Sequence, residues 1–155
     1  MTLSETLKEH AFTAGLSDIH VARLTPLACP VRFGEDDLVL RAGEHSRYFY
    51  LLLSGSMCVE ARNQTCTVFV QALGPGEAFG WSSLLDNHDT LFQVRAREPS
   101  SALRLDGAGL AAVLKDDPEL AANLLLRTLN LVAGRVQATE VRLGELCGMR
   151  MSERR

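Results

Sequence analysis

The stretch between residues 31 and 105 limits the fold of this chain most, because its hydrophobic pattern has a period of two. Short alternating segments follow one another there, separated by turn signals rich in Gly, Asn and Pro. Many short strands with turns between them predict an antiparallel sandwich or a barrel-like roll. The segments are 31–33, 37–41, 48–53, 57–60, 67–73, 91–97 and 102–105.

Helical patterns precede and follow this stretch. Residues 4–28 predict two helices with a break at Gly15, and Ser17 is placed to cap the second. After the strands, Asp106 can cap a short helix over 107–114. Helices that stand outside a block of short strands, rather than alternating with them, indicate an α+β fold.

The last predicted helix is long. Asp117 as N-cap and Pro118 at the first helical position mark its start, and it continues to Cys147. Such a helix is about 45 Å long, about the width of a globule of this size. Its beginning should therefore pack on its own domain, and its far end should lie along a partner or protrude.

The same helix carries apolar or small residues at alternating spacings of four and three. This heptad pattern indicates a seam with a second copy of the chain, that is, a homodimer. The alternative is a long helix packed back on its own domain. The seam residues are Leu129, Val132, Val136, Thr139, Leu143 and Leu146, preceded by Leu125.

Charge and segment length exclude several partners. The net charge of −3 offers no general attraction to nucleic acid, and the basic residues within 148–155 are interpreted as a solvated tail. The N-terminus lacks the apolar segment of a signal peptide, and the longest apolar run, 48–53, cannot span a bilayer. We therefore expect a cytoplasmic protein with no membrane partner and no direct nucleic-acid partner.

No pattern of catalytic or metal-ligating residues stands out. The four cysteines form no CxxC pair, and no nucleophile elbow or Lys-containing phosphate loop is present. Asp86, His88 and Asp89 could be imagined around a metal, but their spacing is nonspecific and a solvated loop is the favoured interpretation. The sequence predicts neither an enzyme nor a metal site.

One turn has the character of an anion site. Gly80 is followed by Trp81, Ser82 and Ser83, which open a short apolar helix. The serines can cap that helix, and backbone N–H groups at a helix N-terminus attract anions. A positive charge would complete such a site, yet after this turn no Lys or Arg occurs before Arg95.

The order of elements, with several local stretches, resembles the cyclic nucleotide-binding domain family, the sensory module of catabolite activator-type (Crp/Fnr-like) bacterial regulators. The resemblance implies one domain over 1–155, with an antiparallel β-roll of the double-stranded jelly-roll type between N-terminal helices and a long C-terminal dimerisation helix. Its parts are helices over 1–28, a roll over 29–105 with a phosphate-binding cassette over 76–91, helices over 106–147 and a tail over 148–155. The stretches are LKEHAFTAGLSDIHVARL, RYFYLLLSGSMCVEA, GPGEAFGWSSLL, QVRA and GRVQATEVRLGEL.

The resemblance also shows where this chain departs from the family. In the family a glutamate after the cassette glycine holds the ribose, and an arginine followed by a hydroxyl residue binds the phosphate. Here Gly80 matches the glycine, but Trp81 stands for the glutamate, Thr90 for the arginine and Leu91 for the hydroxyl residue. On the long helix, Thr139 matches a threonine that contacts adenine. Losing the arginine alone should weaken a cyclic nucleotide by about ten- to several hundredfold.

Three functions remain open. The first is a regulatory ligand-sensing domain that does not bind cyclic AMP in the usual mode, with a cyclic nucleotide kept as a less favoured ligand and no cofactor predicted. The second is a ligand-free dimerisation scaffold in which Trp81 fills the ribose site. The third is the sensory part of a transcription regulator that lacks its DNA-binding domain. The expected pocket residues are Gly80, Trp81, Ser82, Ser83, Thr90, Leu91 and Thr139.

Overall fold

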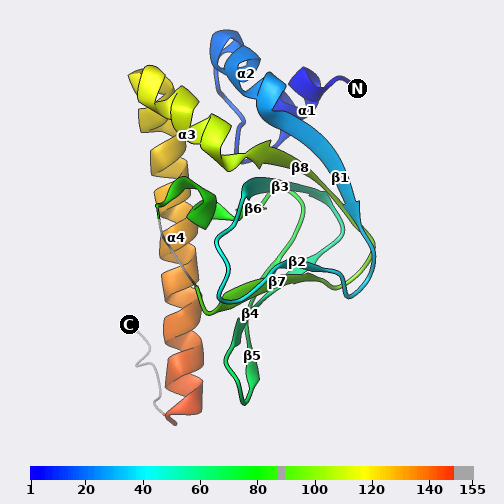
Figure 1. The fold of residues 1–155 in the computed structure, drawn as a ribbon, viewed down its shortest axis with the longest axis vertical. Coiled ribbons are helices and arrows are strands. Elements are labelled where there is room, and N and C mark those ends of the chain that lie inside the picture. The colour runs from blue at the N-terminus through cyan, green and yellow to red at the C-terminus, as the bar shows by residue number, and fades with distance from the viewer. Residues whose placement is uncertain (87–89, 149–155) are drawn as a thin grey trace, which may run out of the picture.

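The computed structural model describes residues 1–86 and 90–148. These residues form two antiparallel four-stranded sheets, with strand orders β1-β8-β3-β6 and β2-β7-β4-β5. The sheets face each other as a roll (Figure 1), which confirms the antiparallel architecture predicted from the period of two. The strands are β1 Ala28–Phe33, β2 Leu38–Leu40, β3 Tyr48–Ser54, β4 Met57–Arg62, β5 Thr67–Leu73, β6 Ala78–Phe79, β7 Phe92–Ala96 and β8 Ser100–Asp106.

Helices flank the roll, and their start signals act as expected in three places. Ser17, Asp106 and Asp117 each accept a hydrogen bond from the backbone N–H three residues later, which caps the helix that follows. The first helix begins at Leu3, earlier than predicted, because Thr2 and Glu5 form a reciprocal capping box. The helices are α1 Leu3–Glu9, α2 Asp18–Leu24, η1 Thr25–Leu27, η2 Trp81–Leu84, α3 Gly107–Asp116 and α4 Pro118–Leu146.

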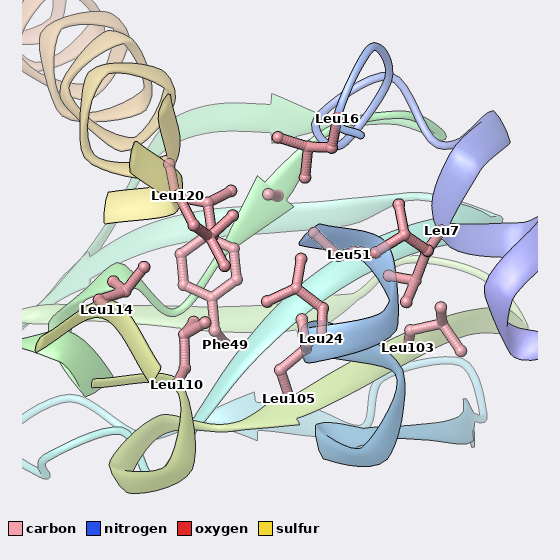
Figure 2. Close-up of a cluster of buried hydrophobic side chains, with 13 residues drawn as sticks. Leu7, Leu16, Leu24, Phe49, Leu51, Leu103, Leu105, Leu110, Leu114 and Leu120 are labelled. Atoms are coloured by element: carbon pink, nitrogen blue, oxygen red, sulfur yellow. The ribbon is translucent and has the colours of Figure 1, made fainter. Parts of the chain in front are cut away.

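Two hydrophobic clusters hold these layers together. The first lies between the helices and the β1-β8-β3-β6 sheet, where leucines of α2, α3 and α4 lie around Phe49 and Leu7 of α1 lies at the other end of the cluster (Figure 2). The second fills the roll itself and includes Tyr50 and Phe79, whose rings stack with centroids 4.8 Å apart. Because β3 alternates its side chains, Phe49 and Leu51 serve the first cluster while Tyr50 and Leu52 serve the second.

α4 runs along the side of the roll (Figure 1). Its start is buried through Leu120 and Leu124, as predicted. Further along, Arg135 bonds to Gln71 and Arg142 lies over the ring of Phe69, 4.9 Å from its centroid. The packing on its own domain therefore extends well beyond the first turns, because the β4–β5 hairpin reaches down beside the helix.

The predicted seam lies on another face of α4. Leu125, Leu129, Val136, Leu143 and Leu146 are each at least half exposed in the single chain. The other two seam residues, Val132 and Thr139, are half-buried and line a groove with Trp81 and Phe92. The seam is therefore exposed at five of its seven positions and partly covered by its own domain at the other two. Within the described part of the chain, no helix combines the length and the apolar character needed to cross a membrane.

Candidate functional site

Gly80 fixes the start of the cassette. The two-residue strand β6 pairs with β3 through Phe79 opposite Tyr50, and it delivers the chain to Gly80 with φ of +82°. A Cβ atom at this position would lie 2.5 Å from the carbonyl oxygen of Tyr48. Only glycine allows the turn to press against β3 in this way.

The short helix after Gly80 is a four-residue 3₁₀ helix, η2, and its serines do not cap it. The Ser83 hydroxyl donates to the Gly80 carbonyl at 2.7 Å, and the N-cap position of η2 carries no side-chain capping hydrogen bond among the described residues. The prediction of serine caps was wrong, because Gly80 in the left-handed region occupies the N-cap position. Both Ser82 and Ser83 are buried.

A cavity of about 270 Å³ opens beside the cassette. Its walls are the β2 strand and the loop to β3, the start of η2, strand β7 and the inward face of α4. Among the expected pocket residues it brings together Gly80, Trp81, Ser82 and Thr90. The residues around them that were not expected include Tyr48, Tyr50, Phe92 and Arg135.

Three expected residues do not line this cavity. Ser83 is buried against Gly80, and Leu91 is 66% exposed on the outer surface beside Arg62. Thr139 lies in an adjoining apolar groove that shares Trp81 with the cavity, and its hydroxyl donates to the Arg135 carbonyl at 2.7 Å. The threonine hydroxyl is thus engaged with its own helix.

Thr90, at the position that the resemblance assigns to an arginine, forms hydrogen bonds with the backbone of two neighbouring segments. Its hydroxyl accepts a hydrogen bond from the Phe92 N–H at 3.1 Å, and its carbonyl accepts one from the Gly43 N–H at 2.6 Å. These contacts start β7 and anchor the loop after β2. Arg95 does not substitute, because it bonds to the Asp36 carbonyl at 2.9 Å outside the cavity.

The buried cation of the cavity is Arg135, which sequence reasoning missed. It is only 9% exposed, its Nε donates to Oε1 of Gln71 at 3.0 Å, and its guanidinium lies 5.2 Å from the centroid of the Phe92 ring. Burial lowers its pKa to about 10, so it stays charged at neutral pH. The sequence could have indicated it, because Arg135 lies on the same face of α4 as the buried Leu120, Leu124 and Thr128.

Further charges stand at the mouth of the cavity. Arg41, Glu44, His45 and Arg47 line it and are exposed. Counting Arg135, three arginines face one glutamate around the opening. The electrostatic character of the cavity is therefore positive, which favours an anionic ligand.

Nothing in the described residues supports a metal ion, since no group of three or more His, Cys, Asp or Glu residues there could hold one. Of the loop residues considered above, Asp86 is exposed, and His88 and Asp89 lie outside the described residues.

Comparisons with known proteins agree with the geometry. The sequence profile of the family described as "Cyclic nucleotide-binding domain" matches residues 30–117. No curated protein sequence matches the chain. A cyclic nucleotide-binding domain from Methylobacillus flagellatus KT has a similar structure, with 20% identity and a TM-score of 0.77 over 97% of this chain and 86% of that one.

Two similar structures belong to longer chains. The Thermus thermophilus Catabolite Activator Protein is 24% identical with a TM-score of 0.68, over 88% of this chain and 63% of that one. The regulatory subunit of a cAMP-independent protein kinase A from Trypanosoma brucei, solved as a mutant bound to cAMP in the A site, is 24% identical with a TM-score of 0.61, over 83% and 52%. At these identities the likeness is one of fold.

Proposed function

The chain belongs to the cyclic nucleotide-binding domain family, and from that membership we propose that it is a cytoplasmic ligand-sensing domain whose cassette does not bind cyclic AMP in the family's usual mode. One observation carries the proposal. Trp81 and Thr90 line the cavity at the positions that match the family's ribose glutamate and phosphate arginine. Without the arginine, affinity should fall by about ten- to several hundredfold, and loss of the glutamate adds to this.

The Trypanosoma brucei relative supports the same interpretation. That protein is described as cAMP-independent, and the form bound to cAMP is a mutant in which a glutamate, a threonine and a valine are exchanged for alanine, arginine and alanine. One of these exchanges introduces an arginine in place of a threonine. Thr90 of the present chain is the residue that we align with the family's arginine.

Two other functions are weighed against this one. A ligand-free dimerisation scaffold would need a closed pocket, and the cavity of about 270 Å³ beside Trp81 favours a ligand instead. The sensory part of a transcription regulator is the second candidate, supported by the fold shared with the Catabolite Activator Protein. In that case the ligand site proposed here would be the sensor of the regulator, and DNA contact would fall to a different domain.

Titration with cyclic AMP and cyclic GMP tests the proposal. Trp81 is the one tryptophan of the chain and lines the cavity, so its fluorescence reports binding. We expect no saturation below about 1 mM for either nucleotide. Saturable binding in the micromolar range would contradict the proposal.

A gain of function sharpens the test. The triple substitution Trp81→Glu, Thr90→Arg and Leu91→Ser restores the family pattern, and calorimetry should then show cyclic AMP binding at least about tenfold tighter than in the wild type. The control is Asn63→Arg, which adds a single arginine on the β4–β5 turn, outside the cavity, and should leave the affinity unchanged.

A further inference from the structure

Three buried polar residues line the cavity with hydrogen-bonding capacity that the described residues leave unused. They are Tyr50, Ser82 and Arg135, which are 6%, 7% and 9% exposed. Among the described residues, neither the Tyr50 nor the Ser82 hydroxyl has a hydrogen-bond partner, and the guanidinium uses only its Nε. Polar groups this deeply buried are normally satisfied.

The unused atoms are not sealed in the protein. Every fully buried side-chain nitrogen or oxygen of the described residues has a hydrogen-bond partner, so the atoms without one reach open space. The cavity is the space that all three residues line. Arg135 also borders the adjoining groove and a smaller pocket, but this cavity is the one that it shares with both hydroxyl-bearing residues. The cavity is therefore where two hydroxyl groups and a guanidinium with unused donors lie together.

Arg135 makes this array selective for negative charge. No carboxylate of the described residues forms an ion pair with it, although a buried charge is costly unless it is paired. Its contacts are the Gln71 amide and the Phe92 ring, both neutral. An anion in the cavity would supply the missing counter-charge, and the guanidinium suits a carboxylate or phosphate group.

We propose that the cavity binds a small organic anion whose carboxylate or phosphate group is held by Arg135 of α4, with the hydroxyls of Tyr50 and Ser82 completing the contacts. The aromatic rings of Trp81 and Phe92 line the same cavity and suit a flat, apolar body on that anion. The charge that holds the ligand thus comes from the long helix and not from the cassette. This inference rests on the proposed ligand-sensing function and specifies its ligand class.

Binding of simple probes to the full chain tests it. The probes are benzoate, phenyl phosphate and the neutral benzamide, followed by Trp81 fluorescence and by calorimetry. Both anions should bind more tightly than benzamide, and Arg135→Gln should weaken them by about tenfold or more while leaving benzamide unchanged. The matched control is Arg142→Gln. Arg142 is on the same helix as Arg135 and also lies over a phenylalanine ring, that of Phe69 in β5, but it does not line the cavity. Preference for one anion separates a carboxylate ligand from a phosphate ligand.

The inference is overturned if the anions bind no better than benzamide, or if the Arg135→Gln protein binds them as well as the wild type does. Thermal melting shows whether Arg135→Gln is folded. If it is not, Tyr50→Phe and Ser82→Ala decide, since each removes a single oxygen. Weaker anion binding in both supports the site, and unchanged binding in both overturns it.

Cyclic AMP in the same titrations separates this inference from the proposed function. Micromolar cyclic AMP binding that disappears in Arg135→Gln would contradict the proposed function and support the anion site. Micromolar binding that survives the substitution would overturn both. Absence of binding by all of the anions would overturn the anion site alone.

Discussion

Arg135 of α4 and Gln71 of β5 are joined by a hydrogen bond of 3.0 Å from Nε to Oε1. Seven residues later, Arg142 lies over Phe69 of the same strand. The C-terminal half of α4 therefore contacts the roll through two arginines, whereas its N-terminal half packs on the domain through buried leucines. The first of these arginines also forms a wall of the cavity, so the attachment of the helix and the ligand site share one side chain.

Gln71→Ala should destabilise the protein by about 1–3 kcal/mol, because it leaves the buried Nε of Arg135 without its acceptor. Urea unfolding followed by circular dichroism measures the change. Gln137→Ala is the control on the exposed surface of α4 and should shift stability by no more than about 0.5 kcal/mol. Equal effects of the two substitutions would show that the Gln71–Arg135 bond contributes nothing.

Gly80→Ala should be more damaging than Gly43→Ala, although both glycines have φ near +80°. The left-handed conformation costs either alanine about 1–2 kcal/mol. At Gly80 the new Cβ would also meet the Tyr48 carbonyl at 2.5 Å, whereas at Gly43 nothing lies within 4 Å. We expect a further loss of about 1–3 kcal/mol at Gly80. Equal unfolding free energies in the two variants would refute the close approach of the cassette to β3.

The sequence predicted the elements that local chemistry determines. The alternating segments and the caps at Ser17, Asp106 and Asp117 depend on residues close together in the chain, and the structure contains them. The two-residue strand β6 was missed, because two residues are too few to show a period. Its place depends on pairing with Tyr50 and Leu51.

The site was predicted less completely than the fold. The motif around Gly80 led to the cavity, but Leu91 points away from it and Thr139 bonds to its own helix. Arg135 was missed because its role depends on the distance from α4 to β5 and β7, elements more than 40 residues earlier in the chain. Resemblance to a motif locates a site, but it does not show which distant side chain supplies its charge.

His10 should make stability fall as the pH is lowered. Its Nδ1 accepts from the Phe12 N–H at 3.1 Å, so its Nε2–H donates to the Leu52 carbonyl at 2.9 Å and the ring is neutral. Burial lowers the pKa of His10 below its ordinary value, against the weaker opposing effect of the Leu52 carbonyl. The unfolded chain then takes up the proton first. This contribution to stability is complete above about pH 6.5 and is lost below it, at up to about 1.4 kcal/mol per pH unit, until the pKa of the folded state is reached.

Urea unfolding from about pH 8 to about pH 5 checks the His10 effect. His10→Gln removes the titrating ring and keeps an amide donor, so its stability should depend less on pH than that of the wild type. Gln137→Ala, which changes no titrating group and lies on the exposed surface of α4, is the control and should keep the wild-type dependence. A His10→Gln protein with the wild-type slope would show that another group is responsible.

The exposed seam of α4 should make the chain a dimer of about 34 kDa, twice the 17.0 kDa of one copy. Leu129 and Val136 are 60% and 51% exposed, so Leu129→Glu or Val136→Glu should leave the monomer folded and place repelling charges in the dimer interface. Sedimentation velocity should then show a single copy. Gln137→Glu adds the same charge on another exposed face of the helix and should remain dimeric. A monomeric wild type would show that there is no such interface, and a dimer that survives both seam substitutions would place the interface elsewhere. In either case the exposed apolar residues of α4 would need a different partner.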